Sequence, residues 1–411
     1  MQTKKKEFPM NPSKRVIMML SIFIGIIFMT PNLFYAQNKA DLLENYLTHI
    51  ASIGADSVPS EYLIAGNSLT FPYIGVVAVD DSNNVYVGDE NRIKVYDQNG
   101  KAKAIIGGPG IGPGEFRFGP SSQSPQVSLI TIGPTGYVTA HARLYIFNVF
   151  DPKYKFINTF SRSDKTEYFF KIFTLNKNEY VYANVTKEQK EHLIYKTYSI
   201  CYVKNDAKTV IASYTQPTDV TNGRSEMDLE FMGFLFYDVA PKRTIMYTQS
   251  RMDEMEEDGK WYYIINTYNI DTGNRNKLKI LFTPDPLPKD VYKRIGNFAG
   301  YSGDDIILQK VKEEEMKKRA ITHYEAFYLV YFDRYIIYIP VRTYLKKDNK
   351  ITHTLLNIID TEKGELIRSI YKHSSLSILA IKNGYLYASG KNAEGYPVVD
   401  KYKIDPALYK R

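Results

Sequence analysis

Short apolar runs alternate with turn-forming residues between Phe71 and Pro120. The apolar runs are Ile74–Val79, Val85–Gly88, Ile93–Asp97 and Ala104–Gly107. Polar residues separate them, and the last break carries Asn99-Gly100, a pair that accepts the positive φ angles of a type I′ hairpin turn. The pattern predicts four antiparallel strands joined by tight turns.

A strand-like run that ends in Asp and meets a turn recurs along the chain. Six such markers are present: Val95–Asp97, Val149–Asp151, Tyr202–Asp206, Asn269–Asp271, Ile358–Asp360 and Tyr402–Asp405. Runs that fit an inner hairpin strand precede the later markers: Ser128–Ile132, Phe170–Leu175, Phe231–Val239, Phe327–Phe332 and Ser377–Ile381. Such self-similarity is the main sequence sign of a repeat fold.

The repeat predicts an all-β fold, a six-bladed β-propeller of four-stranded antiparallel blades over residues 61–411. The sixth marker lies too close to the C-terminus to leave room for the fourth strand of its blade. The isolated run Glu61–Ala65 is predicted to supply that strand, since closing the ring pairs two exposed sheet edges. Seven blades are the alternative, in which Asp304–Gln309 is a strand of a further sheet.

Two insertions lengthen the spacing between markers. Arg251–Lys260 is rich in carboxylates and predicts a solvated hairpin tip, because it lacks the alternating oxygen ligands of a calcium loop. Residues 286–323 predict a short helical insertion. Within it, Gln309–Ala320 places Glu four residues before Lys or Arg three times, which favours an exposed helix.

The N-terminus predicts a secretory signal peptide over residues 1–36. Basic residues precede an apolar run from Val16 to Met29, which is short for a membrane span. We expect an exported protein, periplasmic or secreted, with cleavage after Ala36; an uncleaved membrane anchor is the alternative. Residues 37–60 predict a short helix or tether, from the spacing of their apolar residues.

The net charge and the cysteine content argue against a nucleic-acid-binding protein and against a disulfide-bonded fold. Residues 1–36 carry five basic residues and one acidic residue, so cleavage lowers the formal net charge from +8 to +4. That charge is too small and too dispersed for a nucleic-acid-binding protein. Cys201 is the only cysteine, so the chain forms no internal disulfide and we expect this residue in the core. We expect a monomer.

Gly107–Gly114 has the glycine density of a dinucleotide-binding loop. Pro109 and Pro113 interrupt it, however, and no βαβ pattern follows. We therefore expect a connection between two blades.

The first blade resembles an NHL repeat. The matching residues are Val77–Asp80, Val85–Val87, Asp89, Arg92–Ile93, Val95–Asp97, Gly100 and Gly112–Phe116. The resemblance covers about 50 residues, and the later blades keep little beyond the Asp-and-turn marker. It implies a six-bladed propeller of the exported bacterial type, close to TolB-like propellers, and says little about function.

The signature positions carry two interpretations. Asp80, Asp89 and Arg92 could form a polar ligand site, but an Asp–Arg pair and Asp-capped turns explain them within the blade. The same structural role is expected for the remaining signature residues, Asp97, Gly100, Gly112, Gly114 and Phe116.

The sequence favours a non-catalytic module that binds a protein, peptide or carbohydrate at one face of the propeller. The alternative is an enzyme, since lactonases and lyases that resemble this propeller hold a metal in the central channel. No cofactor is predicted, although a divalent metal in the channel belongs to that alternative. The six histidines are scattered and show no ligand spacing, and no GxSxG nucleophile motif is present. A surface structural protein is a third interpretation.

Overall fold

The computed structural model describes residues 41–54, 58–65, 76–116, 127, 129–143, 146–161, 167–222, 226–229, 232–288, 303–319, 321–347 and 350–410. The compact unit that carries the fold begins at Leu42. The predicted signal peptide, residues 1–36, lies outside the described residues. Within them, no helix is long and apolar enough to cross a membrane.

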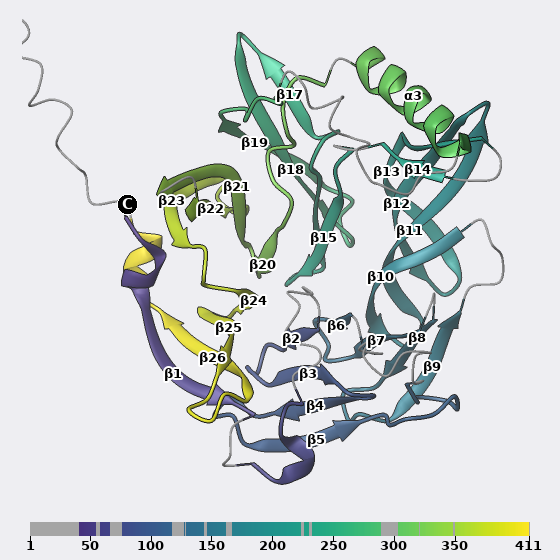
Figure 1. Ribbon diagram of the computed structural model, residues 1–411. Coiled ribbons are helices and arrows are strands. Elements are labelled where there is room, and N and C mark those ends of the chain that lie inside the picture. Colours follow the sequence, from purple (N-terminus) through teal and green to yellow (C-terminus); the bar gives the residue numbers. More distant parts are fainter. Residues whose placement is uncertain are drawn as a thin grey trace, which may run out of the picture. The chain divides into compact units, whose positions relative to one another are not determined.

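Six antiparallel sheets form a ring of blades, as the sequence predicts (Figure 1). Blade 1 contains β2 (Val77–Val79), β3 (Val85–Asp89), β4 (Arg92–Tyr96) and β5 (Ala102–Ile106). Blade 2 contains β6 (Ile130–Ile132), β7 (Val138–Arg143), β8 (Ile146–Phe150) and β9 (Phe156–Ser161). In each blade the strands pair in sequence order, because tight turns connect neighbours.

Blades 3 and 4 are longer and carry one added strand each. Blade 3 contains β10 (Glu167–Asn176), β11 (Glu179–Lys190), β12 (Leu193–Lys204) and β13 (Ala207–Thr221), with β14 (Glu226–Asp228) at its edge. Blade 4 contains β15 (Leu235–Ala240), β16 (Thr244–Gln249), β18 (Lys260–Asn269) and β19 (Arg275–Phe282). The added strand of blade 4 is β17 (Glu254–Glu257), which pairs with the first half of β18.

Blades 5 and 6 complete the ring. Blade 5 contains β20 (Tyr331–Asp333), β21 (Ile336–Lys347), β22 (Lys350–Asp360) and β23 (Glu365–His373). Blade 6 contains β24 (Ile378–Lys382), β25 (Tyr385–Lys391), β26 (Pro397–Ile404) and, from the far end of the chain, β1 (Leu47–Ile53).

The ring closes as predicted, but with a different segment. The strand β1 pairs with β26, whereas residues 60–62 form the 3₁₀ helix η2 (Ser60–Tyr62) and the predicted strand Glu61–Ala65 is wrong. The predicted helix or tether at 37–60 is also wrong over its described part, which holds η1 (Leu43–Tyr46) and β1. The physical reason lies in the tertiary structure. Pairing with the free edge of β26 stabilises an extended strand more than the local apolar spacing stabilises a helix.

The backbone carbonyls next to Glu61 accept hydrogen bonds from side chains of blade 1. Lys94 Nζ donates to the carbonyl of Leu63 at 2.5 Å, and the Tyr96 hydroxyl donates to the carbonyl of Tyr62. These carbonyls therefore bond side chains of blade 1 and not a neighbouring strand.

The insertion between blades 4 and 5 contains the helix α3 (Gly303–Lys318). The predicted helix at Gln309–Ala320 is thus confirmed over Gln309–Lys318, with an earlier start. Asp304–Gln309 lies inside α3, so the seven-blade alternative is wrong. The helix is less solvated than predicted, because Leu308 and Met316 pack against Leu193 and Val220 of blade 3.

The acidic hairpin is exposed at its tip and partly buried at its base. Residues 256–260 are exposed, whereas the side chain of Glu254 is 3% exposed and bonds Arg251 at 2.9 Å. His323 lies within 3.3 Å of the same carboxylate. This part of the hairpin connects blade 4 to the insertion, which the charge pattern did not show.

Apolar clusters between neighbouring blades form the core. Tyr86, Ile93, Phe116, Val138 and Phe150, for example, fill the space between blades 1 and 2. Cys201 is fully buried in the cluster between blades 2 and 3, as expected.

Candidate functional site

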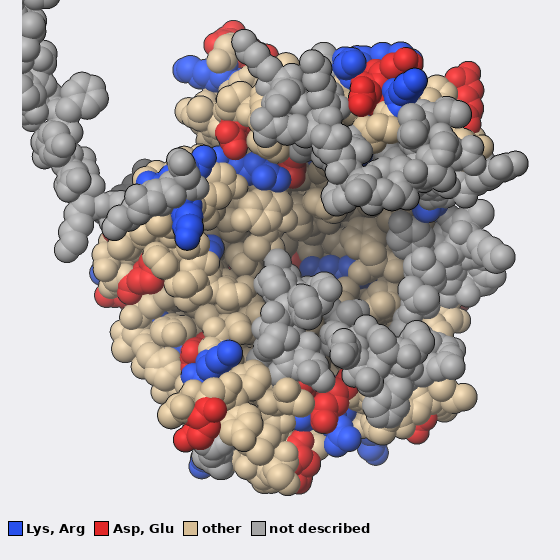
Figure 2. Space-filling model, in the orientation of Figure 1, with Lys and Arg blue, Asp and Glu red and all other residues tan. Residues whose placement is uncertain are grey.

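The innermost strands of the six blades enclose a central channel with a cavity of about 380 Å³. These strands are β2, β6, β10, β15, β20 and β24. Figure 2 shows this face hollowed at its centre, with Lys or Arg atoms at the floor of the hollow. Small-molecule sites are typically concave, mostly apolar and largely preformed.

The channel wall is mainly apolar and aromatic. Seven aromatic side chains line it: Phe170, Phe173, Phe236, Tyr237, Tyr328, Tyr331 and Phe332. The charged residues among its described lining are Lys171, Asp238 and Lys382.

Lys171 extends from β10, the inner strand of blade 3. Its Nζ donates to the carbonyl of Tyr237 at 2.7 Å, and the Tyr237 hydroxyl donates back to the Lys171 carbonyl at 2.6 Å. The ammonium also lies 4.8 Å from the ring centre of Phe173 and 5.9 Å from that of Phe332. Aromatic faces attract a cation, so the rings hold the ammonium in place.

Asp238 faces the same ammonium from blade 4. Its Oδ2 lies 4.0 Å from Lys171 Nζ, beyond hydrogen-bond distance, while Oδ1 accepts the backbone N–H of Val239 at 2.7 Å. The two side chains keep 23% and 28% of their surface exposed. Burial lowers the pKa of Lys171 below its ordinary value, and the charge of Asp238 opposes that shift.

Lys382, the other lysine of the channel lining, forms an ion pair with blade 1. Its Nζ lies 3.2 Å from Asp81 of blade 1, at the turn end of the channel. Nearby, Asp333 accepts the backbone N–H groups of Asn383 and Gly384 at 2.7 and 3.0 Å. These bonds join blades 5, 6 and 1, so Lys382 lies among groups that hold the ring together.

The predicted signature residues lie within blade 1 and its exit, away from the Lys171–Asp238 pair. Asp80 Oδ1 accepts the backbone N–H groups of Ser82 and Asn84 at 2.9 and 2.8 Å. Asp97 does the same for Asn99 and Lys101 at 2.8 and 2.9 Å, and Gly100 has the positive φ that this turn requires. Both carboxylates thus bond backbone N–H groups of their own turns.

The cation beside Asp89 differs from the expected one. Lys94 Nζ lies 2.7 Å from Asp89 Oδ2, and both side chains are buried. Arg92 is the backbone partner of Asp89 in the β3–β4 ladder. Lys94 lies two positions after Arg92 on β4, and therefore on the same face of the sheet as Asp89.

The glycine-rich segment is a connection that leaves blade 1, as expected. Gly107 and Gly114 have positive φ, and a side chain at Gly107 would overlap the ring of Phe116. Gly112 N donates to Glu115 Oε2 at 2.7 Å. Phe116 is fully buried between blades 1 and 2.

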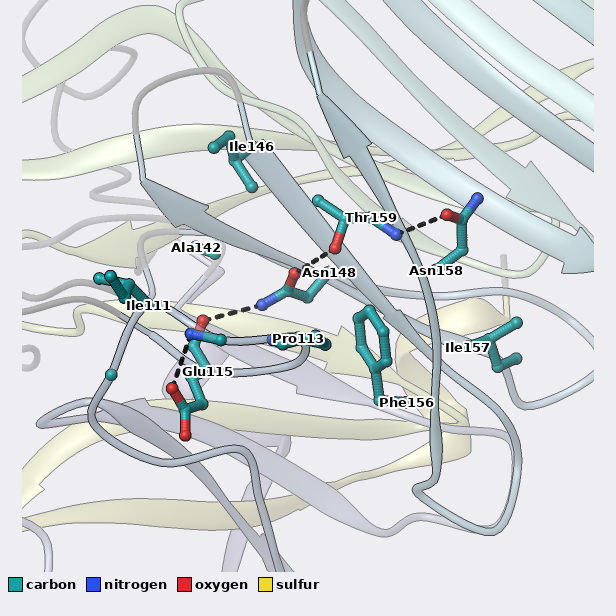
Figure 3. A pocket seen from close by; sticks show the side chains of 12 residues that line it. Ile111, Pro113, Glu115, Ala142, Ile146, Asn148, Phe156, Ile157, Asn158 and Thr159 are labelled. Atoms are coloured by element: carbon teal, nitrogen blue, oxygen red, sulfur yellow. Dashed lines mark hydrogen bonds between the residues drawn. The ribbon is translucent and has the colours of Figure 1, made fainter.

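A second cavity of about 380 Å³ lies between this segment and the outer strands of blade 2 (Figure 3). Asn148 donates to the Glu115 carbonyl at 3.0 Å and accepts from the Thr159 hydroxyl at 3.0 Å. Ile111 at its edge is 77% exposed. The dashed lines in Figure 3 show that Asn148, Thr159 and one oxygen each of Glu115 and Asn158 already bond groups of the protein.

All six histidines are described, and none lines the channel. The structure does bring together two that the sequence separates: His353 and His373 are opposite each other on β22 and β23, with ring centres 4.9 Å apart. Backbone N–H of Ser375 donates to His373 Nδ1 at 3.1 Å. Among the described residues, no three His, Cys, Asp or Glu side chains converge as a metal site would require.

Sequence reasoning missed Lys171 and Asp238. Lys171 interrupts the apolar run Phe169–Phe173, and a charged residue inside a predicted inner strand is a usable signal. Asp238 interrupts Leu235–Ala240 in the same way. Their proximity, 67 positions apart, required the arrangement of the blades.

No family model matches the sequence, and no curated protein matches it. Among solved structures, the chain is similar to a Bacteroides fragilis protein described as exported, at 11% identity over 88% of this chain and 96% of that one, with a TM-score of 0.45. It is also similar to the β-propeller domain of Nup133 from Vanderwaltozyma polyspora, at 9% identity over 82% and 96% of the chains, with a TM-score of 0.32. The WD40 domain of SCAP from fission yeast matches at 11% identity over 80% and 66%, with a TM-score of 0.30. The NHL resemblance stays a prediction.

Proposed function

We propose that the protein is an exported, non-catalytic binding module that takes a small ligand in its central channel. The observation that carries this proposal is the 380 Å³ cavity with aromatic walls and a charged pair, Lys171 and Asp238, whose hydrogen-bonding capacity the protein uses only in part. Apolar walls with a few polar groups are typical of small-molecule sites.

The walls are suited to binding without rearrangement. Each lining strand is paired within its blade, and reciprocal bonds between Lys171 and Tyr237 tie the inner strands of blades 3 and 4 together. A preorganised site loses little conformational entropy when a ligand binds.

The channel metal of the alternative enzyme remains an untested prediction. Among the described lining residues, Asp238 is the carboxylate available to a metal, and Lys171 next to it opposes a cation. We therefore favour the binding module.

The test is a thermal-shift screen of the purified protein against a small-molecule library. A ligand that binds only the folded state raises the unfolding temperature. Ala380 lines the channel, so Ala380→Trp is expected to fill part of the cavity and abolish the shift. Ala207→Trp on the exposed outer strand β13 is the matched control. Hits that stabilise the Ala380→Trp protein as much as the parent would place binding elsewhere and contradict the proposal.

Export is tested separately. Sequencing of the N-terminus of the protein recovered from its native cell is expected to begin after Ala36. A protein that retains residues 1–36 in the membrane fraction would favour the anchor.

A further inference from the structure

Two opposite charges from neighbouring blades face the channel without bonding each other. Lys171 Nζ and Asp238 Oδ2 are 4.0 Å apart, which is too long for a hydrogen bond. Each remains partly exposed to the cavity, at 23% and 28% of the side chain. A stable structural ion pair normally closes to about 2.7–2.9 Å.

Both groups have bonding capacity left for a ligand. An ammonium has three N–H donors, and Lys171 uses one on the Tyr237 carbonyl. Asp238 Oδ1 accepts from Val239, whereas Oδ2 has the 4.0 Å contact with Lys171 as its closest partner among the described groups.

The charge balance of the pair decides what kind of ligand suits it. A ligand that carries only a carboxylate would bond Lys171 but be repelled by the nearby carboxylate of Asp238. A ligand that carries only an ammonium would bond Asp238 but be repelled by Lys171. Because the surroundings are apolar, an unbalanced charge is costly to bury. A ligand with both charges adjacent avoids either conflict.

An α-amino acid has this arrangement. Its ammonium and carboxylate are joined through one carbon, which places nitrogen and oxygen about 3 Å apart. Bound across the 4.0 Å gap, its carboxylate against Lys171 and its ammonium against Asp238 form a ring of alternating charges. The remaining wall is aromatic and suits an apolar side chain.

We propose that the channel ligand is a free amino acid with an apolar side chain, held by Lys171 at its α-carboxylate and by Asp238 at its α-ammonium. This inference rests on the proposed function. The cavity of about 380 Å³ lies at the small end of ligand sites, which fits a single amino acid.

The test uses calorimetry on the whole protein to compare three compounds that share one side chain and differ in the charge of their backbone groups. Phenylalanine is the zwitterion, N-acetylphenylalanine the anion and phenylalanine amide the cation; leucine and methionine with their derivatives extend the series. The parent protein is expected to bind at least one free amino acid ten-fold or more tighter than both of its derivatives.

Two substitutions should reverse the preference. In Asp238→Asn the N-acetyl derivative is expected to bind tighter than the free amino acid, and in Lys171→Met the amide is expected to do so. Such a reciprocal change in specificity cannot come from general loss of folding. Lys242→Met is the matched control, because Lys242 pairs with Glu362 at 3.0 Å outside the channel lining, and it should keep the parent preference.

The outcomes distinguish failure of the amino-acid inference from failure of the proposed channel-binding function. If none of the three amino acids binds, or if all forms bind equally, the amino-acid inference is wrong. The channel function still stands in that case when other ligands bind the parent and not Ala380→Trp. If Ala380→Trp leaves all binding unchanged, both proposals are wrong.

Discussion

Two lysine–aspartate pairs in this molecule have the same charged groups but differ in burial and in the distance between the charges. In blade 1, Lys94 and Asp89 are buried, with 1% and 0% of their side chains exposed, and lie 2.7 Å apart. Lys94 also donates to the Leu63 carbonyl, and the backbone N–H of Ala65 donates to Asp89. In the channel, Lys171 and Asp238 are 4.0 Å apart and partly exposed.

The two pairs differ in how closely the opposite charges approach and in how deeply the side chains are buried. In the blade 1 pair, Asp89 Oδ2 accepts from Lys94 and from the backbone N–H of Ala65, and Lys94 also donates to the Leu63 carbonyl, so the pair holds residues 63–65 against the blade. In the channel pair, Lys171 donates to the Tyr237 carbonyl, and its ammonium stays 4.0 Å from Asp238. The approach of the charges and the burial of the side chains, and not the residue types, distinguish the closed pair from the proposed binding pair.

The largest expected effect is on the closed pair. Lys94→Met leaves the carboxylate of Asp89 buried without its cation, so we expect the free energy of unfolding to fall by about 3–5 kcal/mol. Chemical denaturation measures this. The double variant Asp89→Asn/Lys94→Met should recover part of the loss, and a double variant no more stable than Lys94→Met would argue against an ionic origin.

A smaller loss is expected at the turn of the same blade. Asp97→Ala removes the acceptor of two backbone N–H groups, and we expect a loss of about 0.5–2 kcal/mol by analogy with capping residues. The equivalent residue in blade 2 is Asp151, which accepts from Lys153 and Lys155 at 2.8 and 2.9 Å. Asp151→Ala should therefore lose a similar amount, and unequal losses would mean that the two turns are not equivalent.

The open pair should contribute little to stability. Lys171→Met is expected to change the free energy of unfolding by less than about 1 kcal/mol, since partly exposed, loose ion pairs are weak. Denaturation curves of this variant and of Lys94→Met, recorded together, compare the two settings directly. A loss at Lys171 as large as that at Lys94 would show that the channel pair is structural.

The smallest effect is in the pH dependence. Burial lowers the pKa of Lys171 in the folded protein, so the unfolded chain binds more protons between that pKa and the ordinary value of 10.5. The parent should therefore gain stability relative to Lys171→Met as the pH rises through this window, and the gain should be complete above 10.5. A parent that loses stability relative to the variant there would show that the pKa of Lys171 is raised.

The sequence by itself determined the blades. The Asp turns at Asp97 and Asp151 act through side-chain bonds to residues two and four positions later, so local sequence is sufficient to specify them. Alternating apolar runs set the strands in the same local way, and six blades with an N-terminal closing strand followed from their count.

Tertiary structure decided which distant segments meet. Leu47–Ile53 closes the ring because β26 offers a free edge, although the apolar spacing in that part of the chain resembles a helix. The partner of Asp89 is Lys94 and not the predicted Arg92; strand pairing places both cations on the face that carries Asp89, so local sequence does not choose between them. Lys171 and Asp238 belong to strands of different blades, and only the closed ring turns two charged residues in apolar runs into one site.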